Sequence, residues 1–160
     1  MSMSLSIRRR TFGFSLIELM AALVIVALLL ALALPLYHGQ VVRAKRVQGQ
    51  ASLLKLMQQQ ERYYTQNNRY LAFSAGAQDA QGMQFQWWSG DEPQEGAVRS
   101  AYEIDAVPCP ESTLAQCVLL RARPGTARVD QRFTDADCGT LSLSSTGERG
   151  SSGPAARCWP

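Results

Sequence analysis

Histidine is nearly absent from this chain of 160 residues, in which His38 is the only one. The C-terminal part therefore cannot assemble a serine–histidine–acid triad, and no helix carries a pair of histidines. The sequence also has no glycine-rich phosphate loop, and its cysteines include no C-x-x-C pair. These absences argue against an enzyme, and they predict neither a metal site nor a cofactor.

Charge is scarce between residues 14 and 34, a stretch that is apolar except for Ser15 and Glu18. As a helix it would be about 31 Å long, which matches the hydrocarbon core of a bilayer. Three arginines precede it, at residues 8–10. This asymmetry favours a cytoplasmic N-terminus, with everything after Pro35 on the other side of the membrane.

Two simpler explanations of this segment remain open. A secretory signal peptide would account for Ala31-Leu32-Ala33, which has the form of a leader peptidase site. Its apolar region, however, is usually about 7–15 residues long. A plain signal anchor would account for the length and leave residues 13–18 unexplained. An acid in the bilayer costs on the order of 2.5–3.5 kcal/mol at the centre and less near the interface, so Glu18 calls for a partner.

The run G-F-S-L-I-E-L at residues 13–19 resembles the class III signal of type IV pilins and related pseudopilins. The resemblance implies that a prepilin peptidase cuts between Gly13 and Phe14, and that the new amine of Phe14 is methylated. It also implies that Glu18 neutralises the N-terminal amine of a neighbouring subunit, and that Pro35 bends the helix. One departure is Ala27, where many pilins have glycine.

The same resemblance implies a location and a set of partners. The chain is expected to cross the inner membrane once, with a periplasmic head, and then to join a cell-surface pilus fibre that serves adhesion and twitching motility. Its expected partners are membrane lipid before assembly, prepilin peptidase, the inner-membrane assembly platform, and other major and minor pilins.

Nucleic acid is not an expected partner. Removal of the leader takes away the arginines at residues 8–10, so the formal charge falls from +3 to zero. Local binding through Arg43, Lys45 and Arg46 remains an alternative. These three are predicted instead to form a solvated or membrane-proximal helix face.

After Pro35 the pattern becomes amphipathic and predicts that the helix continues to about residue 64. Its apolar stripe consists of Tyr37, Val41, Ala44, Val47, Ala51, Leu54 and Met57. A loop is expected over residues 67–82, followed by strands over residues 83–88, 101–107, 117–123 and 139–144. The prediction is an α+β pilin fold, with a long helix packed on an antiparallel sheet. Its segments are a leader (1–13), a transmembrane helix (14–34), an amphipathic helix (35–64) and a head (65–160).

Cys109, Cys117, Cys138 and Cys158 all lie in the part assigned to the oxidising side, which predicts disulfides. Sequence alone leaves three connectivities open. The C-terminal stretch resembles the disulfide-bounded loop of pilins, which implies a Cys138–Cys158 pair and, by remainder, Cys109–Cys117. The acids at residues 135 and 137 are predicted to lie in a solvated turn, with a weak calcium site as the alternative.

The stretch E-R-Y-Y-T-Q-N-N-R-Y at residues 61–70 is similar to a segment of PilE-like minor pilins. Its tyrosines, Tyr63, Tyr64 and Tyr70, are expected to close the core where the helix meets the loop. The favoured function is therefore a minor subunit of a type IV pilus. A type II secretion pseudopilin is the alternative in the same superfamily. A membrane-anchored binding domain that never polymerises is the alternative of another class.

Overall fold

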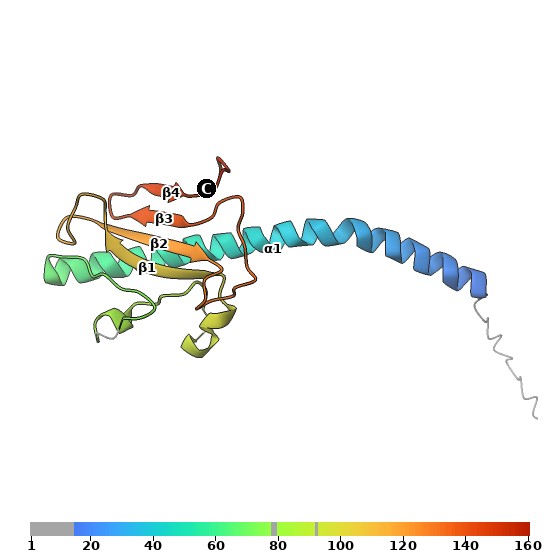
Figure 1. Cartoon of the computed structure of the whole chain (residues 1–160), viewed down its shortest axis with the longest axis horizontal. Coiled ribbons are helices and arrows are strands. Elements are labelled where there is room, and N and C mark those ends of the chain that lie inside the picture. Colours follow the sequence, from blue (N-terminus) through green and yellow to red (C-terminus); the bar gives the residue numbers. More distant parts are fainter. Residues whose placement is uncertain (1–14, 78–79, 92) are drawn as a thin grey trace, which may run out of the picture. The chain divides into compact units, whose positions relative to one another are not determined.

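The computed structural model describes residues 15–77, 80–91 and 93–160. In chain order the elements are helix α1 (Leu16–Asn67), the 3-10 helices η1 (Gly82–Gln84) and η2 (Gln94–Arg99), and the strands β1 (Tyr102–Pro108), β2 (Val118–Pro124), β3 (Leu141–Ser144) and β4 (Arg149–Ser151). One long helix precedes an antiparallel sheet, so the predicted α+β class is confirmed (Figure 1). Gln40–Pro160 forms one compact unit, and the residues before Gln40 form another.

The four strands form a sheet in the order β1-β2-β3-β4, and each neighbouring pair is antiparallel. Alternation places one face of each strand in the core. In β2, Val118, Leu120 and Ala122 are buried, whereas the residues between them are half-buried. Each strand pairs with the next one along the chain, although only residues 145–148, between β3 and β4, form a short turn, whereas residues 125–140 separate β2 from β3.

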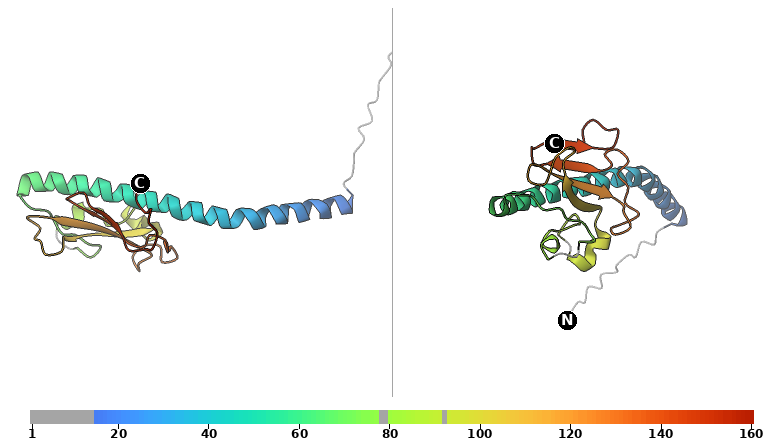
Figure 2. Two further views of the ribbon diagram at one scale, coloured as in Figure 1. Left: turned by 90° about the horizontal axis from the view of Figure 1, so that it is seen from above. Right: turned by 60° about the vertical axis from the view of Figure 1, so that its left-hand side comes forward.

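The core lies between the second half of α1 and one face of the sheet (Figure 2). Leu53 and Leu56 from α1 are buried in one cluster with Ile104 of β1, Leu120 of β2 and Leu141 of β3. The expected tyrosines also contribute. Tyr70 is buried in this cluster, and Tyr63 and Tyr64 pack against it.

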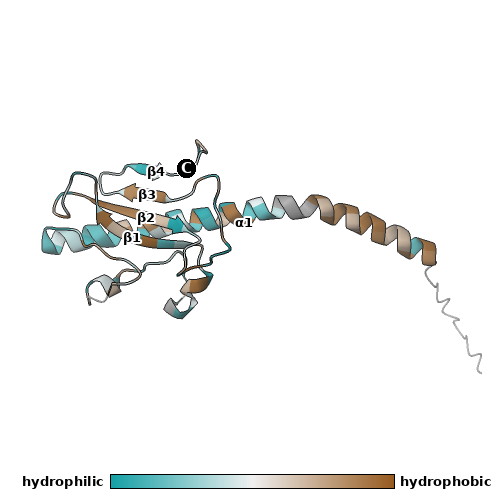
Figure 3. Cartoon of the chain, viewed as in Figure 1, coloured by the Kyte–Doolittle hydropathy of each residue, from teal (hydrophilic) through white to brown (hydrophobic). Residues whose placement is uncertain are grey.

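The apolar stripe predicted for α1 does not face the sheet. Tyr37, Val47 and Leu54 are 67%, 56% and 44% exposed, and of the whole stripe only Met57 packs against the core. The buried face instead carries residues 49, 50, 53, 56 and 60. This buried face contains Gln50 and Gln60. The apolar periodicity therefore predicted the wrong face of the helix to be buried. Figure 3 shows that this half of α1 carries both polar and apolar turns, while β2 and β3 are mainly apolar and β4 is polar.

The strand predicted over residues 83–88 is also wrong. This segment contains η1, and it touches the sheet only through an isolated bridge between Trp88 and Glu103. A second bridge joins Phe73 to Ala106. Two separate bridges therefore cover the outer edge of β1, and neither continues into a ladder.

The other three strands were predicted to within two residues at each end. Two further differences concern the end of the helix and a fourth strand. The helix runs to Asn67, and Asn68 then adopts φ +52° while its N–H bonds to Tyr64 O at 2.8 Å. A left-handed residue after the last turn is a common helix stop, and asparagine tolerates it. Strand β4 was not predicted, because three residues centred on Gly150 carry no alternating pattern.

Candidate functional site

The N-terminal half of α1 presents apolar side chains outward. From Leu16 to Leu32 each large apolar side chain is more than half exposed. This is the one described helix that is long and apolar enough to cross a membrane, with a mean hydropathy of 2.9 over its best window. Leu, Ile and Val exposed at this density are unfavourable in water, so the surface requires lipid or other helices around it.

Glu18 is exposed and lies in the first turn of this helix, where the helix dipole favours a negative charge. Gly13 and Phe14, the expected cleavage and methylation residues, lie outside the described residues. Pro35 falls inside α1 and does not end it.

The second half of α1 is fastened to the head by a buried ion pair that the sequence analysis did not find. Arg46 donates from Nε to Asp135 Oδ2 at 2.8 Å and from Nη2 to Oδ1 at 2.6 Å. The hydroxyl of Tyr102 donates to Asp135 Oδ2 at 2.6 Å, and the backbone N–H of Cys138 donates to Oδ1 at 3.2 Å. One carboxylate thus joins the helix, the first strand and the disulfide loop.

Electrostatics favours the charged form of this cluster. Burial alone would raise the pKa of Asp135, but the hydrogen bonds from Arg46, Tyr102 and Cys138 N–H outweigh it, and the pKa is lowered. The hydrogen bond to Asp135 raises the pKa of Arg46. Burial, followed by the bond to Asp135, raises the pKa of the Tyr102 hydroxyl. At neutral pH the arginine and the carboxylate are therefore both ionised and the tyrosine is neutral.

This arrangement corrects two predictions. Asp135 does not lie in a solvated turn, since its side chain is fully buried, whereas that of Asp137 is 75% exposed. Arg46 does not belong to a solvated helix face with Arg43, because its side chain is only 14% exposed. The described residues contain no group of three or more His, Cys, Asp or Glu that could hold a metal ion, and this includes the acids considered for calcium.

Two buried glutamines fasten α1 in the same way. Gln60 donates to Leu71 O at 2.7 Å and accepts from Leu71 N at 2.9 Å. Gln50 donates from Nε2 to the carbonyl of Cys158. Both side-chain amides therefore form hydrogen bonds with backbone groups of the head. A leucine at either position would leave those backbone groups unpaired.

The structure contains two disulfides, Cys109–Cys117 and Cys138–Cys158. These are the pairs expected from the sequence. The second encloses β3 and β4, and the buried Cys138 directly follows the loop that carries Asp135. The C-terminal disulfide and the ion pair thus act on the same few residues.

Comparison with known proteins assigns the class of this molecule. A family model described as "Type IV minor pilin ComP, DNA uptake sequence receptor" matches residues 35–142, and one described as "Prokaryotic N-terminal methylation motif" matches residues 8–34. The first covers well over half of the chain. The chain therefore belongs to this family of type IV minor pilins.

Solved structures with a similar arrangement include a type IV pilin from Shewanella oneidensis. It is 25% identical, with 74% of this chain and 98% of that chain covered and a TM-score of 0.42. The non-core minor pilin PilV of Neisseria meningitidis is 18% identical, with 72% and 94% covered and a TM-score of 0.41. A search of curated proteins gave no significant match.

The protein is thus a type IV minor pilin subunit with a pilin fold and an N-terminal methylation motif. Pilins are structural subunits that are processed by prepilin peptidase and assemble with other pilins. The exposed apolar half of α1 fits a pilin that is anchored in a membrane.

Proposed function

We propose that this minor pilin enters a pilus fibre through the apolar half of α1, with Glu18 as the residue that sets its position. The supporting observation is a single carboxylate in the first turn of a helix whose neighbouring side chains are exposed and apolar. In the described part of the chain Glu18 has no ion-pair partner. A buried charge without a partner is costly, so a counter-charge on another subunit would both stabilise and align it.

The amine of Phe14 on a neighbouring subunit is the proposed counter-charge. It forms when the leader (1–13) is cut after Gly13, and methylation keeps its positive charge. In this proposal residues 14–34 form the membrane and fibre-core helix, residues 35–64 the amphipathic helix, and residues 65–160 the head. The N-terminus is cytoplasmic and the head periplasmic until the assembly platform moves the subunit into the surface fibre.

The decisive experiment replaces Glu18 with Leu and compares it with Ser15→Ala, which alters a polar residue of the same segment. Three quantities are measured: membrane-associated protein, cleavage after Gly13, and the amount in sheared surface fibres. We expect Glu18→Leu to keep the first two, because Leu inserts more readily than an acid, and to reduce incorporation at least about tenfold. Ser15→Ala should keep all three.

Normal incorporation of Glu18→Leu would refute the role of the carboxylate. The location of the unaltered protein separates the remaining alternatives. Recovery from sheared fibres supports a pilus subunit. Recovery from the envelope alone, with an exported-enzyme defect on deletion, supports a secretion pseudopilin. A chain that keeps residues 1–13 supports a plain anchor.

A second candidate function is DNA binding by the head, because the matching family is described as a DNA uptake sequence receptor. Three exposed arginines support it. Arg99, Arg128 and Arg132 each lie within two residues of the contact between Asp130 N and Ser100 O, at 2.9 Å. Asp130 lies among them and reduces the local charge. The mature chain has no net formal charge, so any affinity would rest on local clusters of arginines such as this one.

This function is tested by fluorescence anisotropy of a labelled DNA duplex at several salt concentrations. Replacing all three arginines with Gln should weaken binding and flatten the salt dependence by about 0.9 in log–log slope for each phosphate that the variant no longer neutralises. Arg43→Gln, an exposed arginine of α1, is the control. Absence of binding at low salt, or an equal slope in the triple variant, would rule the candidate out.

A further inference from the structure

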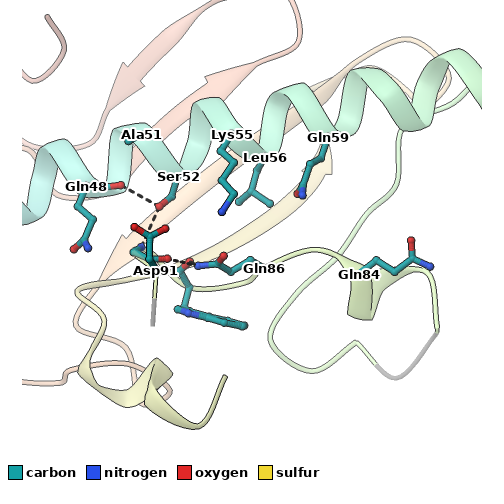
Figure 4. A pocket seen from close by; sticks show the side chains of 11 residues that line it. Gln48, Ala51, Ser52, Lys55, Leu56, Gln59, Gln84, Gln86 and Asp91 are labelled. Atoms are coloured by element: carbon teal, nitrogen blue, oxygen red, sulfur yellow. Dashed lines mark hydrogen bonds between the residues drawn. The ribbon is translucent and has the colours of Figure 1, made fainter. Parts of the chain in front are cut away.

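A polar groove lies between α1 and the segment that precedes η2. It encloses about 230 Å³ and is lined on the helix side by Gln48, Ala51, Ser52, Lys55, Leu56 and Gln59 and on the other side by Gln84, Gln86, Trp88, Gly90 and Asp91. Figure 4 shows Lys55 and Gln59 projecting from α1 toward the segment that carries Gln86. Neither pilus assembly nor the arginines around Ser100 involve these residues.

The two walls of the groove are held together by hydrogen bonds within the head. The backbone N–H of Gly90 donates to Ser52 Oγ at 3.1 Å, and Ser52 Oγ donates to Gln48 O at 3.0 Å (Figure 4). Gln86 Nε2 donates to Trp88 O at 2.9 Å and also to Gly90 O. Gly90 has φ +91°, and a Cβ there would lie 2.5 Å from Gln48 Nε2, so glycine permits this close approach. The groove is therefore preformed, which reduces the entropy cost of binding.

One acceptor in the groove has no partner. Gln59 Oε1 is buried and forms no hydrogen bond in the described structure. Such an atom is unfavourable unless a ligand or water forms a hydrogen bond with it. A second hollow of about 190 Å³, lined by Gln59, Arg62, Tyr63, Gln66, Gln84 and Phe85, shares Gln59 and Gln84 with the first. The side chain of Gln59 therefore borders both hollows.

The chemistry of this lining fits a hydroxyl-rich ligand. A glutamine amide places a donor and an acceptor side by side, and a sugar hydroxyl can both donate and accept. The ring of Trp88 adds apolar surface, which suits the C–H face of a sugar ring. We propose that this groove binds a short carbohydrate chain, with the Gln59 side chain turning so that its amide oxygen accepts from a ligand hydroxyl, and with Lys55 and the amide of Gln48 bonding to further oxygens.

Two other ligand classes fit less well. A polyanion such as single-stranded DNA needs several cations along its backbone, whereas the first hollow has only Lys55 among its lining residues, and the acid Asp91 offsets it. An extended peptide would bind most simply by adding to a strand edge. The nearby edge of β1 is already occupied, because Ser89 N donates to Tyr102 O and Ile104 N donates to Trp87 O.

The test uses the mature full-length chain in a detergent without a sugar headgroup, because glycosidic detergents would compete. The probes are immobilised neutral and acidic oligosaccharides of two to four units. Each bound probe is then titrated by saturation-transfer NMR and tryptophan fluorescence. We expect binding of at least one probe, and a decrease of about tenfold or more in affinity for Gln59→Leu and for Lys55→Met.

The matched control is Gln58→Leu, which changes an exposed glutamine one position away that does not line the groove. It should bind like the unaltered chain. Thermal unfolding of all variants is measured in parallel, and Gln59→Leu should unfold at the same or a higher temperature because it removes an unpaired buried oxygen. Weaker binding by a variant that stays folded therefore reports the site.

Three results would overturn the proposal: no probe bound at tens of millimolar, affinity unchanged by Gln59→Leu, or an equal decrease in Gln58→Leu. Competition by a single-stranded oligonucleotide or an unstructured peptide that binds more tightly than every saccharide would also reject it, in favour of that ligand class. None of these results bears on the role of Glu18 in assembly, which is read from sheared fibres.

Discussion

In the first half of helix α1, Leu16 and Ile17 are 77% and 75% exposed, whereas in the second half Leu53 and Leu56 are 0% and 2% exposed. The polar residues show the reverse. Glu18 is exposed, while Gln50 and Gln60 are buried against the head. Within one continuous helix, apolar side chains therefore face outward in one part and polar side chains face inward in the other.

The difference lies in what each part contacts. The exposed apolar first half requires lipid or other helices around it, and in such surroundings all faces of a helix can be apolar. The second half meets the irregular edge of a small head, where backbone groups such as Leu71 N and Cys158 O need partners. The hydrophobicity of a helix segment thus predicts whether an apolar or an aqueous environment surrounds it. The face of the helix that is buried against the rest of the chain depends instead on which polar groups of the neighbouring segments need hydrogen-bond partners.

Among the variants that test this comparison, Asp135→Asn should have one of the two largest effects on stability. The variant leaves the buried Arg46 beside a neutral amide, with only the exposed carboxylate of Asp137, 3.5 Å from Arg46 Nη2, as a counter-charge. The free energy of unfolding of the head should therefore fall by about 3 kcal/mol. Urea unfolding followed by tryptophan fluorescence measures it, because the tryptophans at residues 87, 88 and 159 all lie in the head. Asp137→Asn is the matched control and should change stability by less than about 0.5 kcal/mol. Equal effects in the two variants would show that the buried pair contributes nothing specific.

The second prediction compares the stability of variants on the two faces of the amphipathic half of α1. Leu53→Ala should cost about 3 kcal/mol because it opens a cavity under the sheet. Leu54→Ala, on the predicted but outward stripe, should cost less than about 0.5 kcal/mol. The same unfolding assay applies. If Leu54→Ala proved as damaging as Leu53→Ala, the assigned rotation of the helix would be wrong.

A smaller destabilisation is expected where the helix approaches β1. A Cβ at Gly49 would lie 3.0 Å from the Tyr102 ring, whereas at Gly39 it meets nothing within 4 Å. Gly49→Val should therefore destabilise the head by about 2 kcal/mol through overpacking. Gly39→Val should have no such effect. A tolerated valine at position 49 would mean that the helix and strand have room to separate.

The smallest effect is on the pH dependence of stability. The pKa of Asp135 is lowered by folding, so its contribution is complete above the unfolded carboxyl value of about 3.9 and is lost as the pH falls below it. The pKa of Tyr102 is raised, so its contribution is complete below about 10 and is lost at higher pH. We expect a plateau between about pH 5 and pH 9. Tyr102→Phe should flatten the alkaline decline, and an unchanged alkaline slope would contradict the assignment.

Much of the sheet could be predicted from the sequence, because its strands follow local rules. Residues 101–107, 117–123 and 139–144 alternate between faces or carry apolar runs bounded by turn residues, and each overlaps a strand of the structure. The N-terminal motif likewise depends on a short contiguous pattern. Features of this kind need no knowledge of distant residues.

The remaining features depend on tertiary contacts. Arg46 and Asp135 are separated by 89 positions, and nothing local distinguishes Asp135 from the solvated Asp137. Residues 83–88 have strand composition, but Gln86 bonds to its own loop and only the end of the segment, Trp87 and Trp88, pairs with β1. The only usable signal was the spacing of Arg46, Gln50 and Gln60 with the buried leucines. Polar residues on that face are read as solvent-exposed by any periodicity argument.

The covered edge of β1 has a consequence for a protein whose purpose is to polymerise. Unpaired strand edges join to one another when copies are crowded together, and such pairing competes with ordered assembly. Here the bridges from Phe73 and Trp88 occupy one edge of the sheet. The other edge, β4, has three residues, and its Gly150 carbonyl accepts from Trp159 Nε1 at 2.8 Å. One edge of the sheet is therefore covered and the other is short, and both features disfavour edge-to-edge pairing between heads.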